Sequence, residues 1–214
     1  MNYTQFKKQF QNNPIIRSRD VILTYDNPQV LRNQLSRWHK KGLLISLRKG
    51  VYLLNTQDRK VEVDAHVLGN VLYEPSYVSL EYALYYYGLI PEAVADITSV
   101  TTRATAAFTN EMGHFIYQHV KPGVFRGFKK FEQGEMSYFM AEPEKALVDF
   151  LYLNLSKFKD DPRDILEHSY RLQNIEDLNT DRFIEWAKLF KTKKLMRVIK
   201  NLVVWIKKLK GGRM

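Results

Sequence analysis

Four charged residues in one short segment have the types and spacing of a metal-dependent nuclease site. Glu142, Glu144 and Asp149 could hold Mg²⁺ through their carboxylates, with Lys145 beside them as a phosphate contact. The same residues also have a structural explanation. Acids stabilise the first turn of a helix, and Lys145 and Asp149 have the i,i+4 spacing of a helical ion pair. We therefore expect no catalytic residue here and keep a Mg²⁺-dependent nuclease as the alternative.

Other catalytic and metal-binding signatures are missing from the sequence. There is no cysteine, and His114 and His119 would face opposite sides of a strand because they are five positions apart. We find no HExxH or CxxC pair, no glycine-rich phosphate loop and no GxSxG element. We expect no metal site and no cofactor.

A second set of residues could recognise double-stranded DNA. Arg32, Asn33, Ser36, Arg37 and Lys40 fall on one helical face, and no acid interrupts that face. Arginine and amide side chains hydrogen bond to base edges, whereas lysine mainly neutralises phosphates. The predicted base contacts are Arg32, Asn33, Ser36 and Arg37. The predicted phosphate contacts are Arg17, Arg19, Lys40, Lys41, Arg48 and Lys49. The plain alternative is that a charged helical face is simply solvated, and a protein-interaction module that does not bind DNA stays a further alternative function.

The segment from Asn27 to Leu54 must position these side chains. Asn27 suits an N-cap and Pro28 the first helical position, and an apolar stripe of Leu31, Leu35 and Trp38 follows. Gly42 is expected to end this helix. Two β-prone runs, 43–47 and 51–54, flank a basic loop whose Gly50 needs a positive φ.

Two shorter helices, 3–11 and 19–25, precede this segment. Three helices followed by a hairpin predict a winged helix-turn-helix module, in which the third helix enters the major groove and the hairpin lies along phosphates. Charge follows the same division. The first 60 residues carry 12 Lys and Arg against 3 Asp and Glu, whereas residues 61–165 carry 9 against 15. Such segregation favours a DNA-binding module over a general solubility charge.

The rest of the chain predicts an α+β domain. We expect a linker at 55–60, and domains at 1–57 and 61–214. Short β-prone runs between 96 and 141 predict a small antiparallel sheet of four or five strands, packed with helices such as 61–72, 80–87 and the one that starts at Pro143. Helices 165–173, 182–190 and 193–210 form a helical C-terminus.

Two helices allow more than one interpretation. The tyrosine-rich helix 80–87 could be a stacking platform or simply a packed helix. The basic amphipathic helix 193–210 could be a packing element, a surface for an acidic partner or a second DNA segment, or a membrane-surface helix. The chain has no apolar leader and no run long enough to span a membrane, so we expect a cytoplasmic protein with no membrane partner.

Several stretches together resemble one family. PSYVSLEYALYYYGLIPE (75–92), ITSVTTR (97–103), GHFIYQHV (113–120) and MAEPEKALVDFLYL (140–153) look like the second domain of AbiEi-type proteins. GLLISLRKGVYLL (42–54) is similar to the end of that family's winged-helix module. The resemblance covers about residues 15–155.

This resemblance implies an antitoxin and transcriptional regulator of a bacterial abortive-infection, type IV toxin–antitoxin system, which is a phage-defence operon. Such a protein would repress its own operon by binding its operator. Its neighbouring gene would encode a nucleotidyltransferase-like toxin, which the antitoxin need not bind in a stable complex. No catalytic role is carried over to this chain.

Overall fold

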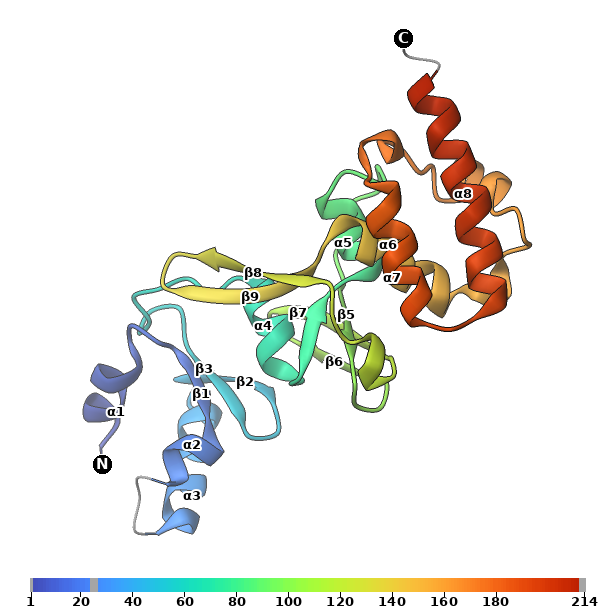
Figure 1. Cartoon of the computed structure of the whole chain (residues 1–214). Coiled ribbons are helices and arrows are strands. Elements are labelled where there is room, and N and C mark those ends of the chain that lie inside the picture. The colour runs from blue at the N-terminus through green and yellow to red at the C-terminus, as the bar shows by residue number, and fades with distance from the viewer. Residues whose placement is uncertain (1, 24–26, 212–214) are drawn as a thin grey trace. The chain divides into compact units, whose positions relative to one another are not determined.

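The computed structural model describes residues 2–23 and 27–211 of the 214-residue chain (Figure 1). The protein is α+β. The chain forms two compact units, one of residues 1–68 and 108–114, the other of residues 69–107 and 115–214. The sequence predicted domains at 1–57 and 61–214. These bounds differ from those of the two units, and the domain division stays a prediction. The end of the predicted helix 19–25 lies outside the described residues.

The first unit contains short helices followed by a hairpin (Figure 1). Its elements are α1 (Tyr3–Phe10), β1 (Ile15–Arg17), α2 (Ser18–Ile22), α3 (Pro28–Lys40), β2 (Leu44–Arg48) and β3 (Val51–Leu54). The strands form a three-stranded antiparallel sheet in the order β1-β3-β2. Strand β1 was not predicted, because three residues are too few to show a strand period.

The predicted apolar stripe of α3 forms the centre of this unit's core. Leu31, Leu35 and Trp38 are all buried, and the Trp38 ring lies 4.6 Å from that of Phe6 in α1. The core cluster contains Phe6, Ile16, Val21, Leu31, Leu35, Trp38, Leu44 and Leu54. Burying this stripe fixes the rotation of α3, so its other face must point to solvent.

Gly42, expected to end the helix, and Gly50, expected to need a positive φ, both have a left-handed conformation. Gly42 follows the end of α3 with φ +71°, and Gly50 sits in the hairpin loop with φ +83°. A Cβ on Gly50 would also lie 3.1 Å from the Ser18 hydroxyl. These two predictions are confirmed, and each glycine joins α3 or β2 to the next element without backbone strain.

The N-cap of α3 gives a first testable prediction. The Asn27 side chain accepts hydrogen bonds from the backbone N–H groups of Gln29 (3.1 Å) and Val30 (3.3 Å). Asn27→Ala is expected to lower the free energy of unfolding by about 1 kcal/mol, because it leaves two helix-terminal donors without their acceptor. Urea denaturation followed by circular dichroism measures this loss. Asn27→Asp should retain most of the stability, and Asn13→Ala, in an exposed loop, should change little; an equal loss in all three variants would exclude the cap.

The segment 55–60 is attached to α1 by polar contacts. Asp58 accepts a 2.6 Å hydrogen bond from the Tyr3 hydroxyl and forms an ion pair with Lys7 at 2.5 Å. Burial raises the pKa of Asp58, but the hydrogen bonds from Lys7 and Tyr3 outweigh it and leave that pKa below its usual value. The backbone N–H of Lys60 also donates to Gln11. These contacts hold the segment beside the helical core of the first unit.

Most of the second unit's residues form a six-stranded sheet, in the order β6-β7-β5-β4-β9-β8, and its helices; the division between the units falls within α4, β6 and β7. The strands of this sheet are β4 (Ser76–Val78), β5 (Ile97–Thr101), β6 (Ala106–Asn110), β7 (Gly113–His119), β8 (Phe128–Gln133) and β9 (Met136–Ala141). The α-helices are α4 (Ala65–Leu72), α5 (Leu80–Tyr86), α6 (Pro143–Leu153), α7 (Thr180–Leu189) and α8 (Lys193–Gly211). Short 3₁₀ turns occupy Pro122–Val124, Leu155–Lys157 and Ile175–Asp177.

The predicted antiparallel sheet is wrong, because the sheet is mixed. Strand β5 pairs with β7 in parallel, and β4 pairs with β9 in parallel through Val78 and Met140. The successive strands β4 and β5, β6 and β7, and β8 and β9 are neighbours in the sheet. The parallel pairs arise because β7 returns beside β5 and β9 returns beside β4. The central strand β4 was also missed, because all three of its residues are buried and show no alternation.

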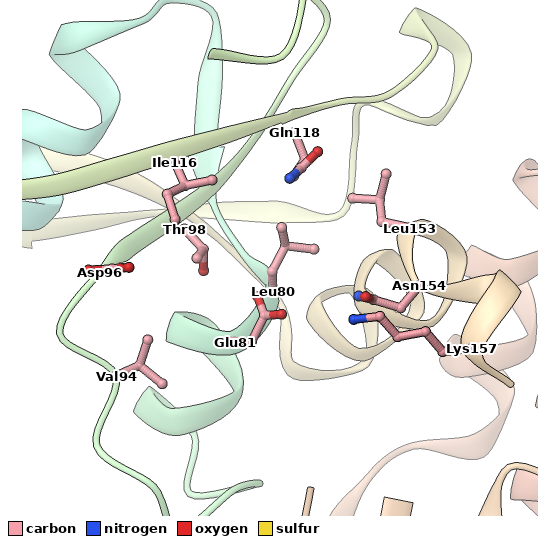
Figure 2. Close-up of a pocket in the computed structure, with 10 residues that line it drawn as sticks. All are labelled: Leu80, Glu81, Val94, Asp96, Thr98, Ile116, Gln118, Leu153, Asn154 and Lys157. Atoms are coloured by element: carbon pink, nitrogen blue, oxygen red, sulfur yellow. The ribbon is translucent and has the colours of Figure 1, made fainter. Parts of the chain in front are cut away.

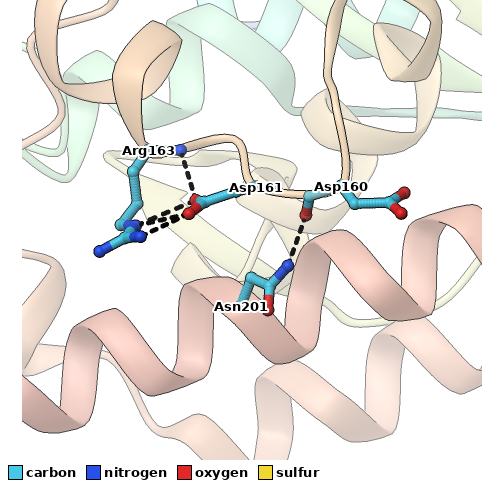
Figure 3. Close-up of polar contacts among 4 residues, drawn as sticks. All are labelled: Asp160, Asp161, Arg163 and Asn201. Atoms are coloured by element: carbon cyan, nitrogen blue, oxygen red, sulfur yellow. Dashed lines mark hydrogen bonds and ion pairs between the residues drawn. The ribbon is translucent and has the colours of Figure 1, made fainter.

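Helices α5, α6, α7 and α8 pack against one another in sequence order (Figure 1). The apolar stripe of α8 is buried, and it includes Leu195, Ile199 and Leu202. Figure 3 shows how the preceding loop is fixed to this helix: the Asn201 side chain donates a 2.8 Å hydrogen bond to the Asp160 carbonyl. The predicted helix 165–173 is instead a π-helical turn, Ile165–Ser169.

Candidate nucleic-acid interface

The exposed face of α3 carries all four predicted base contacts. Arg32, Asn33, Ser36 and Arg37 are exposed, while the opposite face of the helix is buried in the core. Among the described residues, neither arginine forms a side-chain hydrogen bond or an ion pair. The face is therefore polar and cationic and has hydrogen-bonding groups available for a ligand.

The spacing of this face shows that a polar line runs along its middle. Gln29, Asn33, Ser36 and Lys40 follow one another at intervals of four, three and four residues, so they lie in one row. Arg32 and Arg37 fall on either side of that row. The Gln29 side-chain amide donates a 3.1 Å hydrogen bond to Asn33, which holds the two amides together.

Sequence reasoning missed two exposed residues of this face. Gln29 belongs to the row just described but carries no charge, so a search for cations passes over it. Val30 is 48% exposed in the first turn of the helix, where an apolar side chain gains nothing from the core. Amides pair with adenine edges and small apolar groups contact the thymine methyl. Their position one turn before Asn33 could have identified both.

The predicted phosphate contacts fall into two groups. Lys40, Lys41 and Lys49 are exposed, and within the described ranges 2–23 and 27–211 none of them forms an ion pair. Lys40 and Lys41 end α3, and Lys49 occupies the turn of the β2–β3 hairpin. Each ammonium is thus available to neutralise a phosphate.

The three arginines predicted to contact phosphates are each partly buried or already in contact with another side chain, unlike the three lysines. Arg19 is exposed but pairs with Asp20 at 3.3 Å, and Arg17 is half-buried at the end of β1. Arg48 is half-buried, with its guanidinium 5.9 Å from the centre of the Phe108 ring. Arg48 is therefore less accessible to a phosphate than the exposed Lys49 that follows it.

The acidic segment at the start of α6 is buried and internally satisfied. Glu144 accepts a 2.9 Å hydrogen bond from the Asn179 backbone, and Glu142 pairs with Arg182 at 2.8 Å. Lys145 and Asp149 are fully buried and pair with each other. Burial raises the pKa of Asp149 and lowers that of Lys145, because desolvation penalises both charged forms. A fully buried Asp149 cannot reach a phosphodiester bond.

No group of three or more metal-ligating side chains occurs among the described residues. No helix in the same described part of the chain combines the length and apolarity that crossing a bilayer requires.

The tyrosine-rich helix α5 is partly packed: Tyr87 donates a 2.8 Å hydrogen bond to the Ala141 carbonyl, whereas Tyr85 and Tyr86 stay exposed.

The comparisons with known proteins add no relative. A scan against protein-family models finds no match to this sequence, and a search of the curated proteins finds no significant match.

Proposed function

We propose that this chain is a sequence-specific DNA-binding transcriptional regulator that represses its own operon. The observation that carries the proposal is the exposed face of α3, where amides and arginines stand together with no acid over a helix whose other face is buried. Phosphate contacts position such a helix on the duplex, and contacts to base edges specify the sequence. Direct contacts are assigned to Arg32, Asn33, Ser36 and Arg37, and Gln29 joins them.

The first unit is proposed to be a winged helix-turn-helix. Its element order, helix, strand, two helices and a hairpin, supports this proposal, as does the three-stranded sheet that holds the hairpin to β1. In such a module α3 enters the major groove and the β2–β3 hairpin lies along the adjacent backbone. The proposed phosphate contacts are then Lys40, Lys41 and Lys49, with Arg17 and Arg19 near the start of α2.

The resemblance to AbiEi-type proteins supports a more specific proposal. The chain would be the antitoxin of an abortive-infection operon, and its functional partner a nucleotidyltransferase-like toxin. Its place of action would be the cytoplasm, where the operator lies. Testing it requires co-expression with the product of the neighbouring gene: growth arrest by that product, relieved by this chain, is the expected result. Arrest that this chain does not relieve would reject the antitoxin role.

The primary experiment is a gel-shift titration of the full-length protein on the DNA upstream of its own gene. We expect a specific complex, tighter than that on a scrambled duplex of equal length, whose affinity falls steeply as salt rises. Equal affinity for both duplexes would reject sequence-specific binding. The same mixtures with Mg²⁺ test the nuclease alternative, which the buried acids of α6 do not favour.

Lys49→Ala is expected to weaken binding to all sequences alike and to flatten the salt dependence. Loss of one phosphate contact reduces the slope of log K against log salt by about 0.9, because one fewer counterion is released. Gel shifts at four or more salt concentrations measure this slope. Lys121→Ala, an exposed lysine of the second unit, should leave the slope unchanged. An unaltered slope in Lys49→Ala would remove the hairpin from the interface.

A further inference from the structure

A cavity of about 440 Å³ lies in the second unit. Its walls come from the start of α5, from β5 and β7, and from the end of α6 with the turn that follows it (Figure 2). A cavity of this volume accommodates a small organic molecule. None of these residues belongs to the proposed DNA interface.

Two opposite charges face one another across the cavity. The carboxylate of Glu81 and the ammonium of Lys157 point toward each other (Figure 2), but they form no ion pair. Within the described part of the chain, the side chains of Glu81 and Lys157 form no hydrogen bond and no ion pair with any residue. Glu81 is half-buried, and a partly desolvated carboxylate is costly to leave without a partner. A ligand that carries one positive and one negative charge could form an ion pair with each of the two side chains.

The polar wall of the cavity supplies further hydrogen-bonding groups. The Gln118 side chain points into the cavity from β7 and has no partner among the described residues. The Asn154 side chain donates to the Phe150 carbonyl at 3.0 Å, which orients its amide beside Lys157. Gln118 can donate to a ligand carboxylate, and so can Lys157. Asp96 adds a second carboxylate to the lining, so the cavity disfavours a purely anionic ligand.

The remaining wall is apolar. Leu80 projects into the centre of the cavity (Figure 2), and its backbone φ of +61° is one that L-residues rarely adopt. Val94, Ile116 and Leu153 complete this wall. An apolar group of the ligand can therefore be buried while its charged end meets Glu81 and Lys157.

We propose that this cavity binds a free α-amino acid with an apolar side chain. The ammonium group would pair with Glu81 and the carboxylate with Lys157 and Gln118, while the side chain contacts Leu80 and Ile116. Such a ligand is zwitterionic and fits between two charges that are held apart. The charged contacts would fix its orientation and the apolar wall would select its side chain.

Isothermal titration of the full-length protein tests this proposal with L-leucine and two analogues. 4-Methylpentanoate keeps the apolar group and the carboxylate, and 3-methylbutylamine keeps the apolar group and the ammonium. L-Leucine is expected to bind at least tenfold more tightly than either analogue, because each analogue loses one of the two charged contacts, with the half-buried Glu81 or with the exposed Lys157. The other standard amino acids are titrated as well, and an apolar one should bind best.

Variants separate this site from nonspecific binding. Glu81→Gln and Lys157→Met should each weaken L-leucine binding at least tenfold. Glu81→Gln should not weaken binding of 4-methylpentanoate, since that analogue has no ammonium and the variant removes a carboxylate that the analogue leaves unpaired. Lys159→Met, two residues beyond Lys157 and not part of the cavity, is the matched control and should bind normally. Absence of binding by every amino acid at 10 mM, about equal binding of the three leucine-related probes, or normal affinity in both cavity variants would overturn the proposal.

Discussion

Replacing Asp149 with asparagine is expected to lower the free energy of unfolding by about 3–5 kcal/mol, because it leaves the ammonium of Lys145 buried without a counter-charge. Both side chains are completely inaccessible to solvent. Asp149 also accepts hydrogen bonds from the hydroxyls of Tyr77 (2.9 Å) and Ser79 (3.0 Å). Lys145 in turn donates a 2.8 Å hydrogen bond to Tyr77. Urea denaturation followed by circular dichroism measures the change.

The double variant Lys145→Met, Asp149→Asn tests whether the unpaired ammonium of Lys145 causes the loss of stability. It removes the buried ammonium and keeps an acceptor for Tyr77 and Ser79, so it should be more stable than Asp149→Asn alone by at least about 1 kcal/mol. Asp160→Asn breaks an ion pair with Arg197 in which both side chains are more than half exposed, and it should cost under about 1 kcal/mol. If Asp149→Asn costs no more than this control, the buried pair is not a major determinant of stability.

The cluster around Asp149 shows why its role was hard to predict from sequence. Lys145 and Asp149 have the spacing of an ordinary surface ion pair on a helix, and the sequence predicts that pairing. Their burial depends on Tyr77 and Ser79, which lie about 70 residues earlier in the chain. The local i,i+4 spacing therefore predicts the ion pair, but it does not predict that residues distant in the sequence bury this pair.

The segment from Asn27 to Leu54 was predictable because each of its signals is local. The asparagine cap, the apolar stripe and the two glycines with positive φ act within a few residues of the elements they define. Strands β1 and β4 carry no such signal. They exist because Ile15 pairs with Leu53 and Val78 with Met140, and a single sequence does not display such distant pairings.

In the candidate interface too, features set by local sequence were predictable, whereas contacts with distant residues were not. The rotation of α3 follows from its buried stripe, so its exposed residues could be named in advance. The engagement of Arg48 with Phe108 could not, because Phe108 lies 60 residues further along the chain. The cavity beside Glu81 and Lys157 was not predicted either, since its walls come from separate parts of the second unit.

Replacing Arg37 with alanine is expected to reduce affinity for the operator by about 1–3 kcal/mol, or roughly 5- to 150-fold, and to relax the preference at one base position. Arg37 is exposed on α3 beside the polar row of Gln29, Asn33 and Ser36. A guanidinium placed there can donate two parallel hydrogen bonds to the O6 and N7 atoms of guanine. Gel-shift titration gives the affinity, and selection from a randomised duplex gives the base preference.

Arg37→Lys distinguishes a base contact from a phosphate contact. Lysine keeps the positive charge but lacks the planar pair of donors, so it should restore part of the affinity for every sequence without restoring the preference at that position. Arg163→Ala removes a surface arginine of the second unit that pairs with Asp161, and it should bind the operator as the unaltered chain does. If Arg37→Ala instead weakens all duplexes equally and Arg37→Lys recovers binding in full, Arg37 contacts a phosphate. The base specificity of α3 must then come from its amides, Gln29 and Asn33.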